Sequence, residues 1–168
     1  MRAALRDWAD PFLEQAKADL AAAWCLAGQD TDFYASTLCM LIQMVFEKLA
    51  KAAFARNGSG FARSHEAASR FFETLKRHPT SKAILAGAQN VEEFVGELEL
   101  AHPTIAGNHT PPWPQLEYPW EDALSGTVRY PAKDLALARR AADPRCSIVN
   151  DCLRCASTLA QDLWTILP

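Results

Sequence analysis

The fold is decided by the stretch Gln43–Phe54, which reads QMVFEKLAKAAF. Its apolar residues recur at helical spacing, and the same spacing continues on both sides, so we predict one long helix from about Asp32 to Arg56. The run NGSG at 57–60 ends this helix, because asparagine and glycine favour turns. The residues expected on its buried face are Tyr34, Leu38, Leu41, Ile42, Val45, Leu49, Ala52 and Ala53.

The rest of the chain also favours helices. Asp10 followed by Pro11 is typical of a helix start, and Gly28 of a helix end. We expect further helices over about 64–78, with Ser64 as the cap, over 81–100 with a break near Gln89–Asn90, and over 147–167. The residues expected on the buried face of the first helix are Leu13, Ala16, Leu20, Ala23, Trp24 and Ala27. We therefore predict a single domain over residues 1–168, an all-α, up-and-down bundle of about five helices.

The segment 102–127 differs in composition from these helices. Its five prolines forbid a continuous helix. Three large aromatic residues lie among them, namely Trp113, Tyr118 and Trp120. Since a Pro-rich linker open to water rarely carries so many aromatics, we expect a long ordered loop that packs them against the bundle. No strand-like alternation stands out in this segment.

Charge and cysteine content limit the classes of protein that fit. The formal net charge of -3 argues against a protein that coats nucleic acid, which needs a positive surface, and leaves room for a local basic site. Five cysteines, an odd number, fit a reducing compartment better than a disulfide framework. No apolar run reaches the roughly 18 residues of a membrane span, and Met1–Asp7 lacks a signal-peptide core. We expect a cytoplasmic protein without membrane contact.

A polar edge interrupts the apolar central helix. Gln43, Glu47 and Lys51 are spaced four residues apart and therefore share one face. Glu47 precedes Lys51, which is the favourable order for an ion pair within a helix. The edge is either a solvated surface or a seam that faces another helix, a partner or a ligand.

The pattern Gln43-x-x-x-Glu47-Lys48-x-x-Lys51-Ala52 resembles a signature of HEPN domains (higher eukaryotes and prokaryotes nucleotide-binding). Ser64-His65 resembles the turn before the next helix of that family, and Arg129-Tyr130-Pro131 the tripeptide before its last helix. Trp8 near the start of the first helix also fits. The resemblance spans nearly the whole chain, and it implies binding of a nucleotide, RNA or a partner protein such as a nucleotidyltransferase, homodimerisation and a toxin–antitoxin setting.

Three features depart from the family pattern. The segment 102–127 looks like an insertion, and Glu66 stands where Asp is usual. The ribonuclease motif of the family, an Arg followed after four to six residues by His, is missing. Arg70 and His78 come nearest, with seven residues between them. The resemblance therefore implies a non-catalytic binding module; the alternatives are a metal-independent ribonuclease with a displaced Arg/His pair, and a purely structural or interaction protein.

The expected ligand-binding residues are the polar edge together with basic residues of the three matching motifs: Gln43, Glu47, Lys48, Lys51, His65 and Arg129. His65 is otherwise a surface residue of a first helical turn, and Arg129 otherwise a structural partner of a carboxylate. No cofactor or metal is expected, because the single Glu99-x-x-His102 lacks the second copy that a di-iron bundle uses. Cys152-x-x-Cys155 falls on an apolar helix stripe, which favours buried packing.

Overall fold

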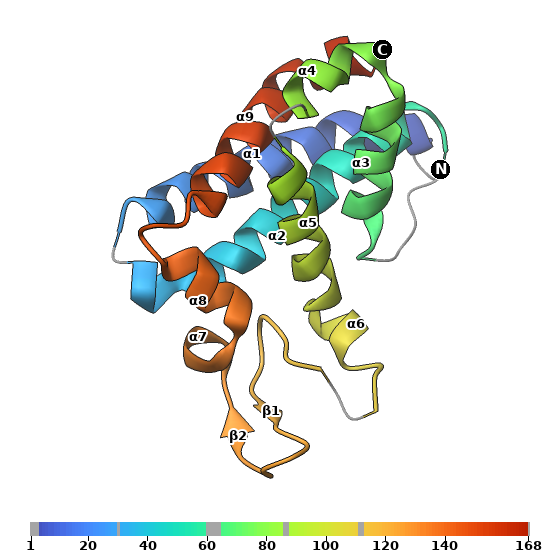
Figure 1. Ribbon diagram of the computed structural model, residues 1–168. Coiled ribbons are helices and arrows are strands. Elements are labelled where there is room, and N and C mark those ends of the chain that lie inside the picture. The colour runs from blue at the N-terminus through green and yellow to red at the C-terminus, as the bar shows by residue number, and fades with distance from the viewer. Residues whose placement is uncertain (1–3, 30, 60–64, 86–87, 111–112, 168) are drawn as a thin grey trace.

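The central element of the fold is α2 (Thr31–Arg56), around which the other helices pack. The structure, a computed structural model, describes residues 4–29, 31–59, 65–85, 88–110 and 113–167. It is mostly helical, which confirms the all-α class. Figure 1 shows α2 crossing the middle of the molecule, and α2 contacts α1, α3, α5, α7, α8 and α9. The predicted core face of α2 is buried or half-buried except for Tyr34, which is exposed.

The first helix, α1 (Ala9–Ala27), packs along α2 and ends at Gly28, as predicted. Two details of the prediction are wrong. A 3-10 turn, η1 (Leu5–Trp8), runs directly into α1, so Asp10 lies inside the helix and does not cap it. Trp24 is 40% exposed, because its position lies on the flank of the helix, where its indole N–H donates to the Ser157 hydroxyl at 3.2 Å.

Short helices and one long helix complete the bundle. The predicted break is confirmed, since the helix that follows it begins at Gln89. The proposed Ser64 cap lies outside the described residues. The elements are α3 (Ala67–Arg77), η2 (Pro79–Ser81), α4 (Lys82–Leu85), α5 (Gln89–Leu100), α6 (Pro103–Ala106), α7 (Pro131–Asp134), α8 (Ala136–Ala142) and α9 (Ile148–Ile166). The helices α7 and α8 were not predicted, because elements this short show no clear hydrophobic period.

The described part of the segment 102–127 follows the prediction only in part. Trp120 is buried, whereas Trp113 and Tyr118 are exposed. A small antiparallel sheet, also not predicted, pairs β1 (Trp120–Glu121) with β2 (Val128–Arg129). Two-residue strands are too short for their alternation to be seen in the sequence. This hairpin projects from one end of the bundle (Figure 1).

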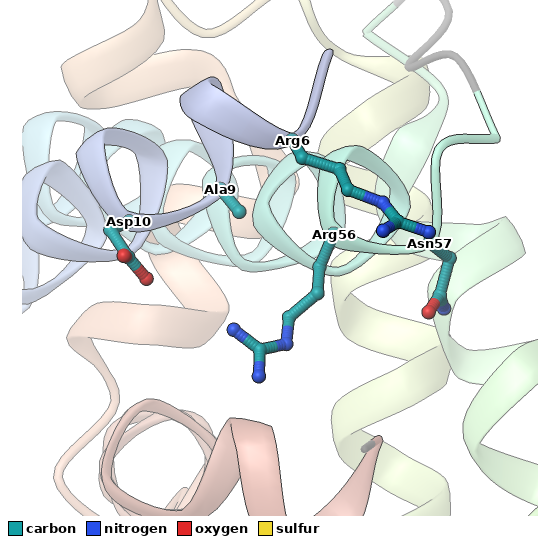
Figure 2. Close-up of a pocket in the computed structure, with 5 residues that line it drawn as sticks. All are labelled: Arg6, Ala9, Asp10, Arg56 and Asn57. Carbon is teal, nitrogen blue, oxygen red and sulfur yellow. The ribbon is translucent and has the colours of Figure 1, made fainter. Parts of the chain in front are cut away.

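An open pocket of about 410 Å³ lies where η1 meets the end of α2 (Figure 2). Its walls carry Arg6, Asp10, Arg56 and Asn57. Among the helices that the structure describes, none combines the length and the apolar character needed to cross a membrane.

Candidate functional site

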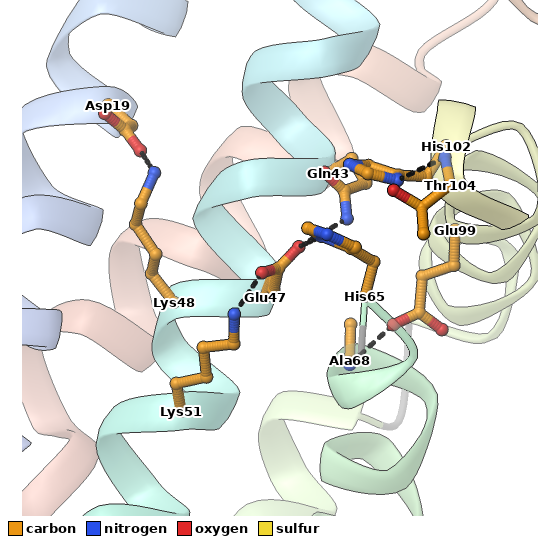
Figure 3. Close-up of polar contacts among 10 residues, drawn as sticks. All are labelled: Asp19, Gln43, Glu47, Lys48, Lys51, His65, Ala68, Glu99, His102 and Thr104. Carbon is orange, nitrogen blue, oxygen red and sulfur yellow. Dashed lines mark hydrogen bonds and ion pairs between the residues drawn. The ribbon is translucent and has the colours of Figure 1, made fainter. Parts of the chain in front are cut away.

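The polar edge of α2 is organised around Glu47, whose side chain is only 9% exposed. Its Oε2 accepts a hydrogen bond from Gln43 Nε2 at 2.9 Å and lies 3.0 Å from His65 Nδ1. Its Oε1 forms an ion pair with the Lys51 ammonium. Four of the six expected site residues therefore meet at one carboxylate, as Figure 3 shows. We call Gln43, Glu47, Lys51 and His65 the Glu47 cluster.

The surroundings keep Glu47 ionised. Burial on its own raises the pKa of a carboxyl, but the hydrogen bonds from Lys51, His65 and Gln43 outweigh it and lower the pKa of Glu47 to about 2. An ionised carboxylate only accepts hydrogen bonds, so His65 carries a proton on Nδ1. In the neutral ring, His65 Nε2 is then an acceptor directed away from Glu47.

His102 extends the cluster to the end of α5. Its ring stacks on the His65 ring with centroids 3.6 Å apart and an interplanar angle of 15°. His102 Nδ1 accepts a hydrogen bond from the backbone N–H of Thr104 at 3.2 Å, so the proton of the neutral ring lies on Nε2. Burial, and then the charge of His65, lower the pKa of His102, which keeps the stacked pair from carrying two positive charges. Among the described residues neither Nε2 atom has a hydrogen-bond partner.

Glu99 lies beside this cluster and is 2% exposed. It accepts hydrogen bonds from the backbone N–H groups of Ala68 at 2.6 Å and Ser69 at 3.1 Å, and one from the Ser69 hydroxyl. These backbone donors belong to the first turn of α3, where no helical carbonyl is available to them. Glu99 is thus a cap supplied to α3 by another helix, and both of its carboxylate oxygens are occupied by that role.

The other two expected residues lie apart from the Glu47 cluster. Lys48 points to a different side of α2, toward α1, where it pairs with Asp19 (Figure 3). Arg129 lies in the hairpin, 3.5 Å from Asp134 and 3.9 Å from Asp122. Its surroundings match the structural alternative, in which the arginine pairs with carboxylates.

Sequence reasoning missed His102, Glu99 and Asp19 as members of these polar networks. The Glu99-x-x-His102 spacing stands out in the sequence, but it suggests a metal site and not a helix cap or a ring stack. Asp19 gives no signal, because a single carboxylate on a helix face is ordinarily exposed.

The remaining chemical candidates are structural. Cys152 and Cys155 are buried on α9, as predicted, and burial raises the pKa of Cys155 to about 12, so neither thiol is a ready nucleophile. Arg70 lies on α3 and His78 follows that helix, so they are separated by about 12 Å along its axis. That separation argues against both contacting one phosphate. In the described part of the chain, no three His, Cys, Asp or Glu side chains are grouped to hold a metal ion.

Lys51 and His65 therefore meet at one buried carboxylate, and His102 stacks on His65. All three side chains remain partly accessible. The arrangement supplies hydrogen-bond donors, an acceptor and aromatic faces, but no nucleophile with an adjacent base among the described residues. No protein-family model, curated protein or solved structure matches the chain.

Proposed function

We propose that this protein is a non-catalytic, HEPN-like module that binds a nucleotide or a single-stranded RNA segment at the Glu47 cluster. The observation that carries the proposal is the stacked, partly exposed His65–His102 pair, with both Nε2 atoms free of partners among the described residues. Unpaired bases bind proteins by stacking on aromatic side chains, histidine included, and by hydrogen bonds to their edges.

The charges of the cluster suit a binding role. Glu47 is held ionised at neutral pH, and it fixes both Lys51 and His65 in position. The missing ribonuclease motif and the separation of Arg70 from His78 support binding over cleavage.

The test is titration of the protein with a short fluorescein-labelled single-stranded RNA, followed by anisotropy. We expect His65→Ala and His102→Ala each to weaken binding about tenfold, because stacking contributes roughly 1–3 kcal/mol per base. Lys76→Ala is the matched control, since Lys76 is an exposed lysine paired with Glu73 and Glu92 on α3 and α5. Equal affinities for wild type and both histidine variants would refute the proposed site, and cleavage of the RNA would favour the ribonuclease alternative.

A second candidate, self-association, rests on the hairpin. Leu124 is fully exposed and Val128 is 69% exposed, although both are apolar. Contiguous exposed apolar patches mark interaction surfaces, and these two side chains of one hairpin are the candidates for such a patch. If this surface pairs two copies, wild type will elute as a dimer in size-exclusion chromatography with light scattering, and the double variant Leu124→Asp/Val128→Asp as a monomer. A monomeric wild type would rule out this candidate.

A further inference from the structure

Two arginines share the open pocket between η1 and α2. Arg6 comes from η1 and Arg56 from the last turn of α2, and both line the same space of about 410 Å³. Within the described residues neither guanidinium forms an ion pair. Figure 2 shows Asn57 beside Arg6, and Asp10 on the other side of Arg56. The pocket therefore offers two charged donors, one amide and one carboxylate acceptor.

Arg56 is held in place by a contact that leaves its hydrogen-bond donors available. Its guanidinium carbon lies 4.6 Å from the centre of the Trp164 ring of α9. A planar guanidinium that stacks on an aromatic face keeps its N–H groups directed outward in its own plane. The contact with Trp164 thus fixes the position of the Arg56 guanidinium. Its N–H groups have no acceptor among the described residues, so they are available to an anionic ligand.

The charge balance of the pocket favours an anion. The two guanidinium groups outweigh the single carboxylate of Asp10 and the roughly half negative charge at the C-terminal end of α2. Arginine binds phosphate by paired N–H donors, and the Asn57 amide adds a neutral donor. The Asp10 carboxylate, which would repel a bare anion, suits a ligand that also carries a hydroxyl donor.

We propose that this pocket binds a phosphate ester of a small hydroxyl-bearing molecule, with Arg6, Arg56 and Asn57 on the phosphate and Asp10 on a hydroxyl. The site is separate from the Glu47 cluster. Arg56 lies nine residues after Glu47 on α2, which places it about 14 Å along the axis and on the opposite side of the helix. This binding activity is therefore distinct from the proposed RNA binding, and each can be tested without the other.

The test is isothermal titration of the full chain with inorganic phosphate, ribose 5-phosphate and AMP. We expect ribose 5-phosphate to bind more tightly than inorganic phosphate, and Arg6→Ala and Arg56→Ala each to weaken its binding by about tenfold or more, since a charge-assisted hydrogen bond is lost. Arg77→Ala is the matched control, because Arg77 occupies the last turn of α3 as Arg56 does that of α2. Asp10→Asn should remove the preference for the sugar phosphate and leave inorganic phosphate bound.

A second arginine variant, a comparison of two ligands and a His65→Ala control separate the possible causes of a change in binding. Within the described part of the chain, the Arg6 guanidinium does not lie over an aromatic ring, so Arg6→Ala tests the site even if Arg56→Ala disturbs packing on Trp164. If AMP binds more tightly than ribose 5-phosphate, the ligand is a nucleotide. If the two bind equally well, the ligand is a sugar phosphate. No binding of ribose 5-phosphate by wild type, or unchanged binding by Arg6→Ala and Arg56→Ala, would overturn the proposal. His65→Ala should leave this binding intact, which separates it from the Glu47 cluster.

Discussion

Replacing Glu47 with glutamine is expected to lower the free energy of unfolding by about 3 kcal/mol. The shift in pKa from 4.5 to about 2 measures how strongly the folded protein prefers the ionised form, at roughly 1.4 kcal/mol for each pKa unit. The neutral amide introduced by Glu47→Gln would leave the Lys51 ammonium, only 15% exposed, without its carboxylate. Thermal unfolding at neutral pH should show a melting temperature lower by about 6–12 °C.

The pH dependence identifies the cause of this loss. Because the folded pKa of Glu47 is lowered, its contribution is complete above about pH 4.5 and disappears as the pH falls toward about 2. The stability difference between wild type and Glu47→Gln should therefore shrink over that range. Glu14→Gln is the control, since Glu14 is 70% exposed and pairs only with Lys17 among the described residues. A difference that stays constant between about pH 5 and 2 would show that lost packing, and not the charge network, causes the effect.

Helix periodicity was enough to predict the all-α class and the long helices. The long helices α1, α2 and α9 bury their apolar stripes close to the predicted positions. The prediction is wrong where contacts between distant parts of the chain determine the local structure. Trp24 stays at the surface to bond Ser157, and the β1–β2 hairpin exists through pairing of strands too short to show a period.

The site was predictable only within one helix. Gln43, Glu47 and Lys51 share a face by spacing, so their meeting follows from the sequence. That His65 joins them and that Lys48 turns toward Asp19 depends on which helix faces meet, and a 3.6-residue period does not contain that information. For the same reason His102 was missed, because it reaches the cluster from the far end of α5.

Glu99→Ala should be the most destabilising of these substitutions, at about 4 kcal/mol. It removes the acceptor of two backbone N–H groups and one hydroxyl at the start of α3, and a buried donor left unpaired costs about 1–3 kcal/mol. Water can reach Ser69, which is exposed, but not Ala68, which is fully buried. The expected fall in melting temperature is about 8–16 °C, measured by circular dichroism.

The control for Glu99 lies on the same helix and differs mainly in burial. Glu97 is half-exposed and pairs with Arg140 at the surface, so Glu97→Ala should unfold near the wild-type temperature. Burial raises the pKa of Glu99, so its contribution is complete below its ordinary value of 4.5 and declines as the pH rises through the folded value. The gap between wild type and Glu99→Ala should thus widen on acidification, opposite to Glu47→Gln. Equal unfolding temperatures of Glu97→Ala and Glu99→Ala would refute the capping role. A gap that narrows on acidification would show that the hydrogen bonds to the ionised carboxylate outweigh its burial.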